Sequence, residues 1–287
     1  MAFALNLNGK VALVTGGSRG IGAETVRLLR ASGARVAFNY LKARAQAEAL
    51  MAECNGAGGT GAADNPSCVA PLCVAIEQEL SSPAEGRRLV ESAVAAMGRL
   101  DILVANHGVW EAEDVPIAQM DEAQWRRTLA VNLDAVFGLV QAAVRQMLTQ
   151  SDFAAAGAGR ETHATNSGAR GHIVLISSTA GQRGEAYHAD YAVTKGALIS
   201  LTKSLSTELA PQGIRVNCVA PGWVATDMSK STLADPETGK KIAAAIPLGR
   251  VATAREIAGP IVFLCTPLAG FISGEILNVN GGAVLAG

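Results

Sequence analysis

Tyr191 and Lys195 lie four residues apart in a segment whose apolar spacing predicts a helix. This spacing puts both side chains on one helix face. A tyrosine hydroxyl has a pKa near ~10 in model peptides, and a neighbouring ammonium lowers that pKa by favouring the phenolate. Such a tyrosine can exchange a proton with a carbonyl or hydroxyl oxygen. Solvated surface pairs have the same spacing, so the pair alone leaves both interpretations open.

Ser178 follows a predicted buried strand over residues 172–177 and comes shortly before Tyr191. Its hydroxyl can donate a hydrogen bond to a substrate oxygen as negative charge builds there. A serine at a strand end more commonly forms a turn or caps a helix. Ser178 is therefore a candidate catalytic residue whose role depends on its surroundings.

A glycine-rich turn, TGGSRGIG at residues 15–22, lies between a predicted strand and a predicted helix. Gly16, Gly20 and Gly22 tolerate positive φ, and their missing Cβ atoms let the backbone approach a pyrophosphate. The following helix start offers free N–H groups and the positive end of its dipole. This context favours a dinucleotide site over a plain tight turn.

The end of the next predicted strand, residues 35–40, indicates which dinucleotide binds. NAD sites place a carboxylate there to hold the ribose hydroxyls. Here the chain has Asn39, Tyr40 and Lys42 instead. Arg19 and Lys42 can meet a 2′-phosphate, which favours NADP over NAD, although both are otherwise ordinary solvated charges.

Strands and helices alternate along the chain. We expect strands at 10–15, 35–40, 74–78, 101–106, 172–177, 214–219 and 275–279, and helices at 21–32, 42–53, 83–97, 121–149, 190–209 and 254–264. This order predicts one α/β domain over residues 1–287, a Rossmann-type doubly wound parallel sheet of about seven strands with helices on both faces. Two aperiodic segments, 55–71 and 151–170, are predicted loop insertions. Each leads from a helix into a strand, so we expect both far from the ligand edge.

The composition excludes several classes of protein. Apolar residues make up 49% of the 287 residues and charged residues 17%, which excludes intrinsic disorder. With 24 basic and 25 acidic residues, the net charge of −1 points to neither nucleic acid nor a membrane surface. We expect no transmembrane helix, no secretory signal and no metal site. The five scattered cysteines indicate free thiols in a reducing compartment, the cytoplasm.

Taken together and in this order, the motifs resemble the short-chain dehydrogenase/reductase (SDR) family over residues 10–282. The motifs that match the family are the glycine turn, Asn106-x-Gly108, Asn132, Ser178, Tyr191-x-x-x-Lys195, Pro221-Gly222 with Thr226, and Asn280-Gly-Gly. The phrases PGWVATDM at 221–228 and PLGRV at 247–251 are similar to those of 3-oxoacyl-acyl-carrier-protein reductases. Many relatives of other specificity share them.

The resemblance implies a role for each matching position. Tyr191 would be the general acid in ketone reduction, Lys195 would lower its pKa and bind the nicotinamide ribose, and Ser178 would hold the substrate oxygen. Asn132 would keep a water in a proton relay behind Lys195. The implied cofactor contacts are Gly16, Ser18, Arg19, Gly20, Ile21, Gly22, Asn39, Tyr40, Glu79, Leu80, Asn106, Gly108, Tyr191, Lys195, Pro221, Gly222 and Thr226.

The sequence departs from the family at two places, the turn at 105–108, where Ala105 replaces the usual asparagine and removes one side-chain hydrogen bond, and Glu79-Leu80. His107 stands where a small residue is usual, and we interpret it as packed or hydrogen-bonded rather than catalytic. Glu79-Leu80 stands where an aspartate near the adenine is usual. Both departures leave the catalytic set unchanged.

The resemblance implies an NADP-dependent oxidoreductase that reduces a 3-oxoacyl thioester or related ketone to a secondary alcohol. The alternatives are an NAD(P)-dependent alcohol, sugar or hydroxysteroid dehydrogenase, and a non-catalytic dinucleotide-binding regulator. Residues 226–250 resemble the family's substrate lid, and we expect Trp110, Glu111, residues 182–188 and residues 223–250 to line the substrate pocket. By analogy the chain forms a homotetramer or homodimer.

Overall fold

The computed structural model describes residues 5–56, 71–150 and 169–285. Seven parallel strands form one sheet in the order β3-β2-β1-β4-β5-β6-β9, as the alternating pattern predicts. The chain order reverses across β1 and β4, which is where open α/β sheets bind ligands at their carboxyl edge. The strands are β1 (Val11–Val14), β2 (Arg35–Tyr40), β3 (Cys73–Glu77), β4 (Ile102–Ala105), β5 (Gly171–Ile176), β6 (Ile214–Pro221) and β9 (Ile276–Val279).

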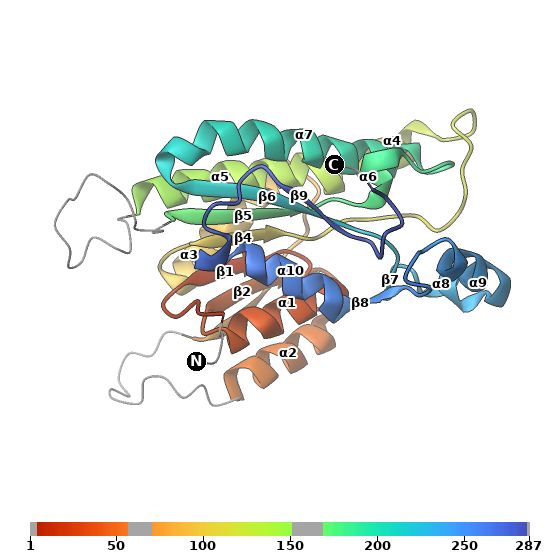
Figure 1. Ribbon diagram of the computed structural model, residues 1–287. Coiled ribbons are helices and arrows are strands. Elements are labelled where there is room, and N and C mark those ends of the chain that lie inside the picture. The colour runs from red at the N-terminus through yellow and green to blue at the C-terminus, as the bar shows by residue number, and fades with distance from the viewer. Residues whose placement is uncertain (1–4, 57–70, 151–168, 286–287) are drawn as a thin grey trace.

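Helices cover both faces of this sheet (Figure 1). In β1, Ala12 and Val14 pack into one core cluster and Val11 and Leu13 into the other, because successive strand residues face opposite sides. The first cluster includes residues of α1 (Gly20–Ala31), α2 (Arg44–Gly56) and α10 (Ala254–Leu264). The second includes residues of α3 (Pro83–Met97), α5 (Ala135–Thr149) and α7 (Ala189–Leu209).

The helix expected over 121–149 is continuous but not uniform. It comprises α4 (Glu122–Leu129), a π-helical turn (Ala130–Asp134) and α5. By length and composition this run could cross a membrane. Its buried residues Ala135, Leu139 and Met147 belong to the core that covers the sheet, however. Its apolar character is therefore that of a core helix.

The segment expected to form a lid contains two short helices, α8 (Lys230–Ala234) and α9 (Pro236–Ala244). It projects from the body at the carboxyl edge of the sheet (Figure 1). Two short parallel strands, β7 (Val224–Ala225) and β8 (Ala252–Thr253), pair at its base. A further short helix, α6 (Thr179–Arg183), connects β5 to α7, and 3-10 turns lie at Ala210–Gln212 and Pro267–Ala269.

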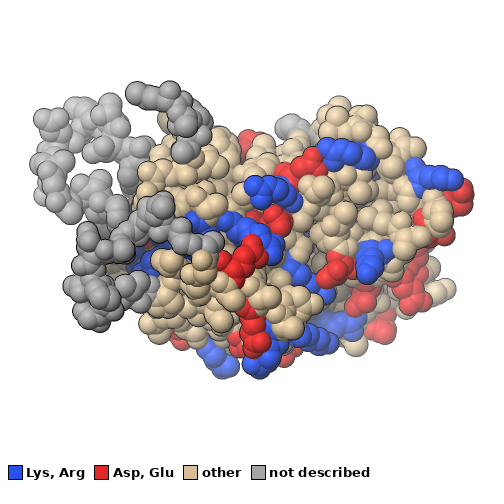
Figure 2. Space-filling model, turned by 90° about the horizontal axis from the view of Figure 1, so that it is seen from below, with Lys and Arg blue, Asp and Glu red and all other residues tan. Residues whose placement is uncertain are grey.

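Most of the two predicted insertions, residues 57–70 and 151–168, lies outside the described residues. Helix α2 continues through Gly56, so the first insertion begins slightly later than position 55. The described residues resume at positions 71 and 169, just before β3 and β5 begin. Both positions lie at the edge of the sheet opposite to the carboxyl ends of its strands. On the face shown in Figure 2, basic and acidic side chains are interspersed.

Candidate active site

The glycine turn after β1 has the backbone geometry that its sequence predicts. Gly16 and Gly20 have φ values of 62° and 54°, which L side chains rarely adopt. A Cβ on Gly22 would lie 2.1 Å from the Gly16 carbonyl oxygen. The turn is therefore closed to any larger residue at position 22.

Helix α1 begins at this turn with its N-terminal amides uncapped. Its N-cap is Arg19, whose guanidinium carries only donors and makes no capping hydrogen bond. No acidic residue lies in the first helical turn. The free N–H groups and the helix dipole suit an anion, so the turn fits a dinucleotide pyrophosphate. Thr226 faces the same turn, since a Cβ on Gly20 would lie 3.3 Å from its Cγ2.

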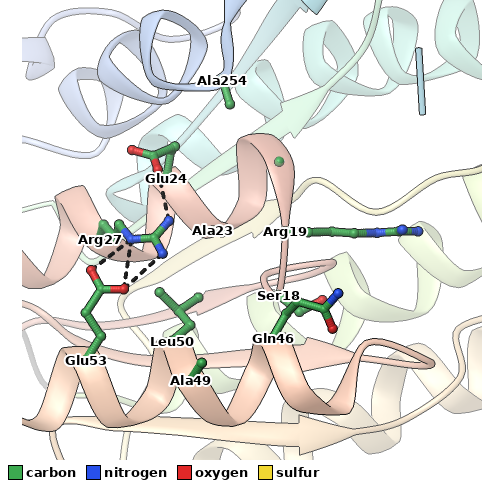
Figure 3. Close-up of a pocket in the computed structure, with 11 residues that line it drawn as sticks. Ser18, Arg19, Ala23, Glu24, Arg27, Gln46, Ala49, Leu50, Glu53 and Ala254 are labelled. Carbon is green, nitrogen blue, oxygen red and sulfur yellow. Dashed lines mark hydrogen bonds and ion pairs between the residues drawn. The ribbon is translucent and has the colours of Figure 1, made fainter. Parts of the chain in front are cut away.

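A hollow of about 380 Å³ runs from this turn between α1 and α2 (Figure 3). Arg27 lies across it and forms ion pairs with Glu24 and Glu53. The closest nitrogen–oxygen distance is 2.9 Å in both pairs. Arg19 points away from the hollow. Its guanidinium lies 3.3 Å from Asp227, and both side chains are more than half exposed. This ion pair is weak, because exposed pairs contribute about 0–1 kcal/mol.

Residues at the ends of β2 and β3 hydrogen-bond neighbouring segments of the protein, and one of them, Asn39, holds the glycine turn. Asn39 accepts a hydrogen bond from the Gly16 amide at 2.8 Å and donates to the Gln78 carbonyl at 2.9 Å. The Tyr40 hydroxyl donates to Glu77 at 3.3 Å. Glu79 is exposed, whereas Leu80 packs into the core.

The turn after β4 is hydrogen-bonded to the glycine turn. Asn106 donates from Nδ2 to the carbonyls of Thr15 and Gly16, at 3.0 and 3.3 Å. A Cβ on Gly108 would lie 3.1 Å from Asn132 Oδ1 and 3.3 Å from Lys195 Nζ. The glycine at 108 thus lets the β4 turn approach two candidate catalytic residues.

His107 is half-buried and hydrogen-bonds two segments of the chain. The Thr15 hydroxyl accepts hydrogen bonds from the Asn106 and His107 amides, so its own proton donates to His107 Nδ1 at 2.8 Å. The ring proton is then assigned to Nε2, which donates to the Val131 carbonyl at 3.0 Å. Burial, with the Lys195 ammonium nearby, lowers the His107 pKa to about 4. The expected packed and hydrogen-bonded role is confirmed.

Asn132 lies within the π-helical turn and is fully buried. Its Oδ1 accepts from the Val109 amide at 2.8 Å, and its Nδ2 donates to the Val109 carbonyl at 2.9 Å and to Thr194 at 3.3 Å. π-turns insert one residue into a helix and are frequent at functional sites. Through the Asn132 side chain, the π-turn is hydrogen-bonded both to the loop after β4 and to α7, the helix that carries Lys195.

Ser178 caps a helix and also lies next to the Tyr191 hydroxyl. Its Oγ accepts a hydrogen bond from the Ala180 amide at 3.1 Å and so caps α6. It also hydrogen-bonds the Tyr191 hydroxyl, which favours the phenolate and acts to lower the Tyr191 pKa. The neighbouring Ser177 donates to the Lys195 carbonyl at 2.7 Å and ties the strand end to α7.

Tyr191 is half-buried and Lys195 is buried on one face of α7. Lys195 Nζ lies 5.5 Å from the centre of the Tyr191 ring and donates to the Ile176 carbonyl at 2.9 Å. Burial raises the pKa of Tyr191 to about 12, contrary to the expected lowering, because loss of water outweighs the Ser178 hydrogen bond. Burial also lowers the pKa of Lys195 to about 8. At neutral pH the pair is therefore a phenol beside an ammonium, a proton-donating state.

Pro221 and Gly222 end β6 beside the closing motif of the chain. A Cβ on Gly222 would lie 3.1 Å from Asn280, so glycine is needed for this approach. The structure thus brings the glycine turn, Asn132, Ser178, Tyr191, Lys195 and Thr226 to the carboxyl edge. In the described residues, no group of three or more His, Cys, Asp or Glu side chains could hold a metal ion.

Comparisons with known proteins agree with this geometry. The family model described as enoyl-(acyl carrier protein) reductase matches residues 16–284. A 3-oxoacyl-[acyl-carrier-protein] reductase of Synechocystis is 34% identical over 97% of this chain and 98% of its own. The chain belongs to the short-chain dehydrogenase/reductase family.

Other similar proteins have different names. An L-rhamnose 1-dehydrogenase (NAD(P)(+)) of Azotobacter vinelandii is 34% identical over 95% of this chain and 96% of its own. A blue fluorescent protein from a metagenomic library, solved in complex with NADPH, is 34% identical with a TM-score of 0.80 and covers 98% and 100% of the two chains. This SDR is therefore an NAD(P)-dependent oxidoreductase acting on CH–OH donors.

Sequence reasoning missed two features of this SDR site. The first is Glu185, whose carboxylate is close enough to raise the Tyr191 pKa. It falls within the predicted pocket segment 182–188, but no spacing rule distinguished it. The second is the π-turn, which a helical period does not reveal.

Proposed function

We propose that this SDR reduces a ketone to a secondary alcohol with NADPH, with Tyr191 as the general acid. The observation that carries the proposal is the half-buried Tyr191 phenol beside Lys195, which stays protonated at neutral pH because loss of water raises its pKa to about 12. When bound, the nicotinamide supplies the hydride that reaches the carbonyl carbon. Tyr191 gives its proton to the carbonyl oxygen, and Lys195 stabilises the negative charge left on the phenol oxygen.

Ser178 orients the substrate oxygen toward Tyr191, since its hydroxyl already contacts that phenol. The Asn132 side chain holds the π-turn against the loop after β4 and fixes the wall behind Lys195. All four side chains are present and meet at one edge. This speaks against a non-catalytic dinucleotide-binding regulator.

The preference for NADPH rests on Arg19 and on the end of β2. Position 39 is an asparagine, and its side chain accepts a hydrogen bond from the Gly16 amide. This position therefore offers no carboxylate to hold the ribose hydroxyls of NAD. Arg19 is mostly exposed beside the glycine turn, and its weak pair with Asp227 leaves it able to reach a 2′-phosphate. The similar blue fluorescent protein, which was solved in complex with NADPH, supports the same choice.

The proposed substrate is a 3-oxoacyl thioester or a related ketone, since the relatives' names include both thioester reductases and a sugar dehydrogenase. We further propose a cytoplasmic homotetramer or homodimer. Exposed apolar side chains on α5, α7 and near β9, namely Phe137, Val193, Leu268 and Phe271, support an interface between copies. The four described cysteines carry free, buried thiols, which fits a reducing compartment.

The test measures consumption of NADPH and NADH with an acetoacetyl thioester and with simple ketones. Tyr191→Phe is expected to lower kcat by about 10²–10⁴-fold while NADPH binding is unchanged. Glu122→Gln, at an exposed position on α4 outside the predicted pocket, serves as the control. Equal rates of ketone reduction by the Tyr191→Phe variant and the wild type would reject the assigned role.

A further inference from the structure

Two side-chain hydrogen bonds join the start of α7 to α4 and the π-turn. The Thr128 hydroxyl, near the end of α4, donates to the Asp190 carboxylate at 2.7 Å. Four residues further along both segments, Asn132 Nδ2 donates to the Thr194 hydroxyl at 3.3 Å. All four side chains are buried, and none is more than 3% exposed. The two contacts therefore fix the register of α7 against the segment beside it.

Each contact lies next to a residue of the candidate active site. Tyr191 directly follows Asp190, and Lys195 directly follows Thr194. The contact beside Lys195 is made by Asn132, which already belongs to the candidate catalytic set. The contact beside Tyr191 is made by two residues outside that set, and it has no part in the mechanism proposed for this site.

Tyr191 depends on such a contact because it lies in the first turn of α7, where helices fray. The N-cap residue, His188, makes no side-chain capping hydrogen bond. Its Nε2 lies 3.2 Å from Asp114, whose side chain is 71% exposed, so this pair holds the turn only weakly. The buried Asp190 carboxylate, by contrast, accepts a second hydrogen bond from Gln124 Nε2 of α4, at 3.3 Å.

We propose that Asp190, held by Thr128, is a positioning residue that fixes the Tyr191 phenol for proton transfer. The inference rests on the proposed function, because it takes Tyr191 as the proton donor to a carbonyl. The Asn132 contact holds Lys195 separately, so loss of the Asp190 carboxylate should displace the phenol and leave the lysine in place. A displacement of about 1 Å can lower a rate by about 10²-fold, so a small shift of the first turn is enough.

The first measurement is ¹⁹F NMR of protein labelled with fluorotyrosine, which needs no substrate. The chain has three tyrosines, so Tyr191→Phe assigns the Tyr191 resonance and the other two serve as internal controls. Asp190→Ala should broaden this resonance or shift it toward that of free fluorotyrosine. Asp190→Asn should leave it near the wild-type position, because the amide oxygen can still accept the Thr128 hydrogen bond. An unchanged Tyr191 resonance in Asp190→Ala overturns the inference, whether or not the protein reduces ketones.

The second measurement separates kcat for ketone reduction from NADPH binding. Asp190→Ala should lower kcat about 10- to 100-fold and leave the NADPH dissociation constant nearly unchanged. Thr128→Val, which keeps the side-chain shape, should lower kcat in the same direction and tests the same contact if Asp190→Ala does not fold. The double variant should be no slower than Asp190→Ala, because both substitutions remove one hydrogen bond. Thr207→Val removes an exposed hydroxyl from the same helix, α7, and is the matched control.

The last comparison uses the Tyr191→Phe background. If Asp190 acts through the phenol oxygen, Asp190→Ala should cause no further loss of the residual rate in Tyr191→Phe. Equal fractional losses in both backgrounds, or an NADPH affinity that falls together with kcat, would show a merely structural role and overturn the inference. If the wild type binds NADPH but reduces no ketone, the proposed function has failed, and the NMR result then decides whether Asp190 positions the phenol.

Discussion

His107 should make the stability of the fold depend on pH in a predictable window. Its pKa is about 4 in the folded protein against 6.5 for a solvated imidazole, because burial disfavours the charged ring. Between these values the unfolded chain binds more protons than the folded one. The stabilisation is therefore complete above pH 6.5 and is lost as the pH falls through 4.

The size of the effect follows from the pKa shift. Each pKa unit is worth about 1.4 kcal/mol, so a lowering from 6.5 to about 4 removes about 3 kcal/mol of unfolding free energy between pH 7 and pH 4. His107→Ala cannot titrate at this position and should lose about 3 kcal/mol less over the same range. At pH 7 it should already be less stable by about 2–4 kcal/mol, because Thr15 and Val131 each lose a buried hydrogen-bond partner.

Urea unfolding followed by far-UV circular dichroism, at fixed protein concentration across this pH range, measures both effects. His107→Gln is the informative companion, since its amide can still donate to the Val131 carbonyl but has no charge to gain. It should lose the pH dependence while keeping more stability at pH 7 than His107→Ala. Wild-type and His107→Ala curves that run parallel from pH 7 to pH 4 would refute the reasoning.

Two further predictions concern the chemistry and the cofactor. The kcat/KM of ketone reduction should fall about tenfold per pH unit above pH 8, because Lys195 with its pKa of about 8 then loses the charge that stabilises the Tyr191 oxygen; a profile flat to pH 10 would contradict this. Gly22→Ala should abolish NADPH binding in a fluorescence titration, because its Cβ would lie 2.1 Å from the Gly16 carbonyl oxygen. Gly259→Ala, whose Cβ meets nothing within 4 Å, is the matched control and should bind normally.

Much of the fold was predictable because its signals are local. The limits of β2, α3 and α10 agree with the expected ones, since a buried parallel strand and a helix with clear ends have distinct periodicities. The candidate catalytic residues were predicted from the family's motifs rather than from chemistry alone. Without Ser178 at the preceding strand end, the spacing of Tyr191 and Lys195 would fit a solvated surface pair equally well.

The missed features depend on contacts distant in sequence. The π-turn at Asn132 lies within the apolar period of a long helix, and the Asn132 side chain bonds Val109 and Thr194, which are distant in sequence. The direction of the Tyr191 pKa shift depends on how deeply the phenol is buried, and spacing does not report burial. Glu185 lies in a loop whose path is fixed by a positive φ at Tyr187 and by the Val115 amide donating to the Tyr187 carbonyl at 3.2 Å.

The two altered pKa values together favour one direction of catalysis. A general acid must hold its proton until the carbonyl oxygen becomes basic, and Tyr191, with a pKa of about 12, does so at every physiological pH. Alcohol oxidation needs the phenolate instead, which burial and the nearby Glu185 both disfavour. Lys195 remains mostly charged at neutral pH and, in the mechanism that we propose, would stabilise the oxygen after the proton has left. These protonation states are the ones that the proposed reduction requires.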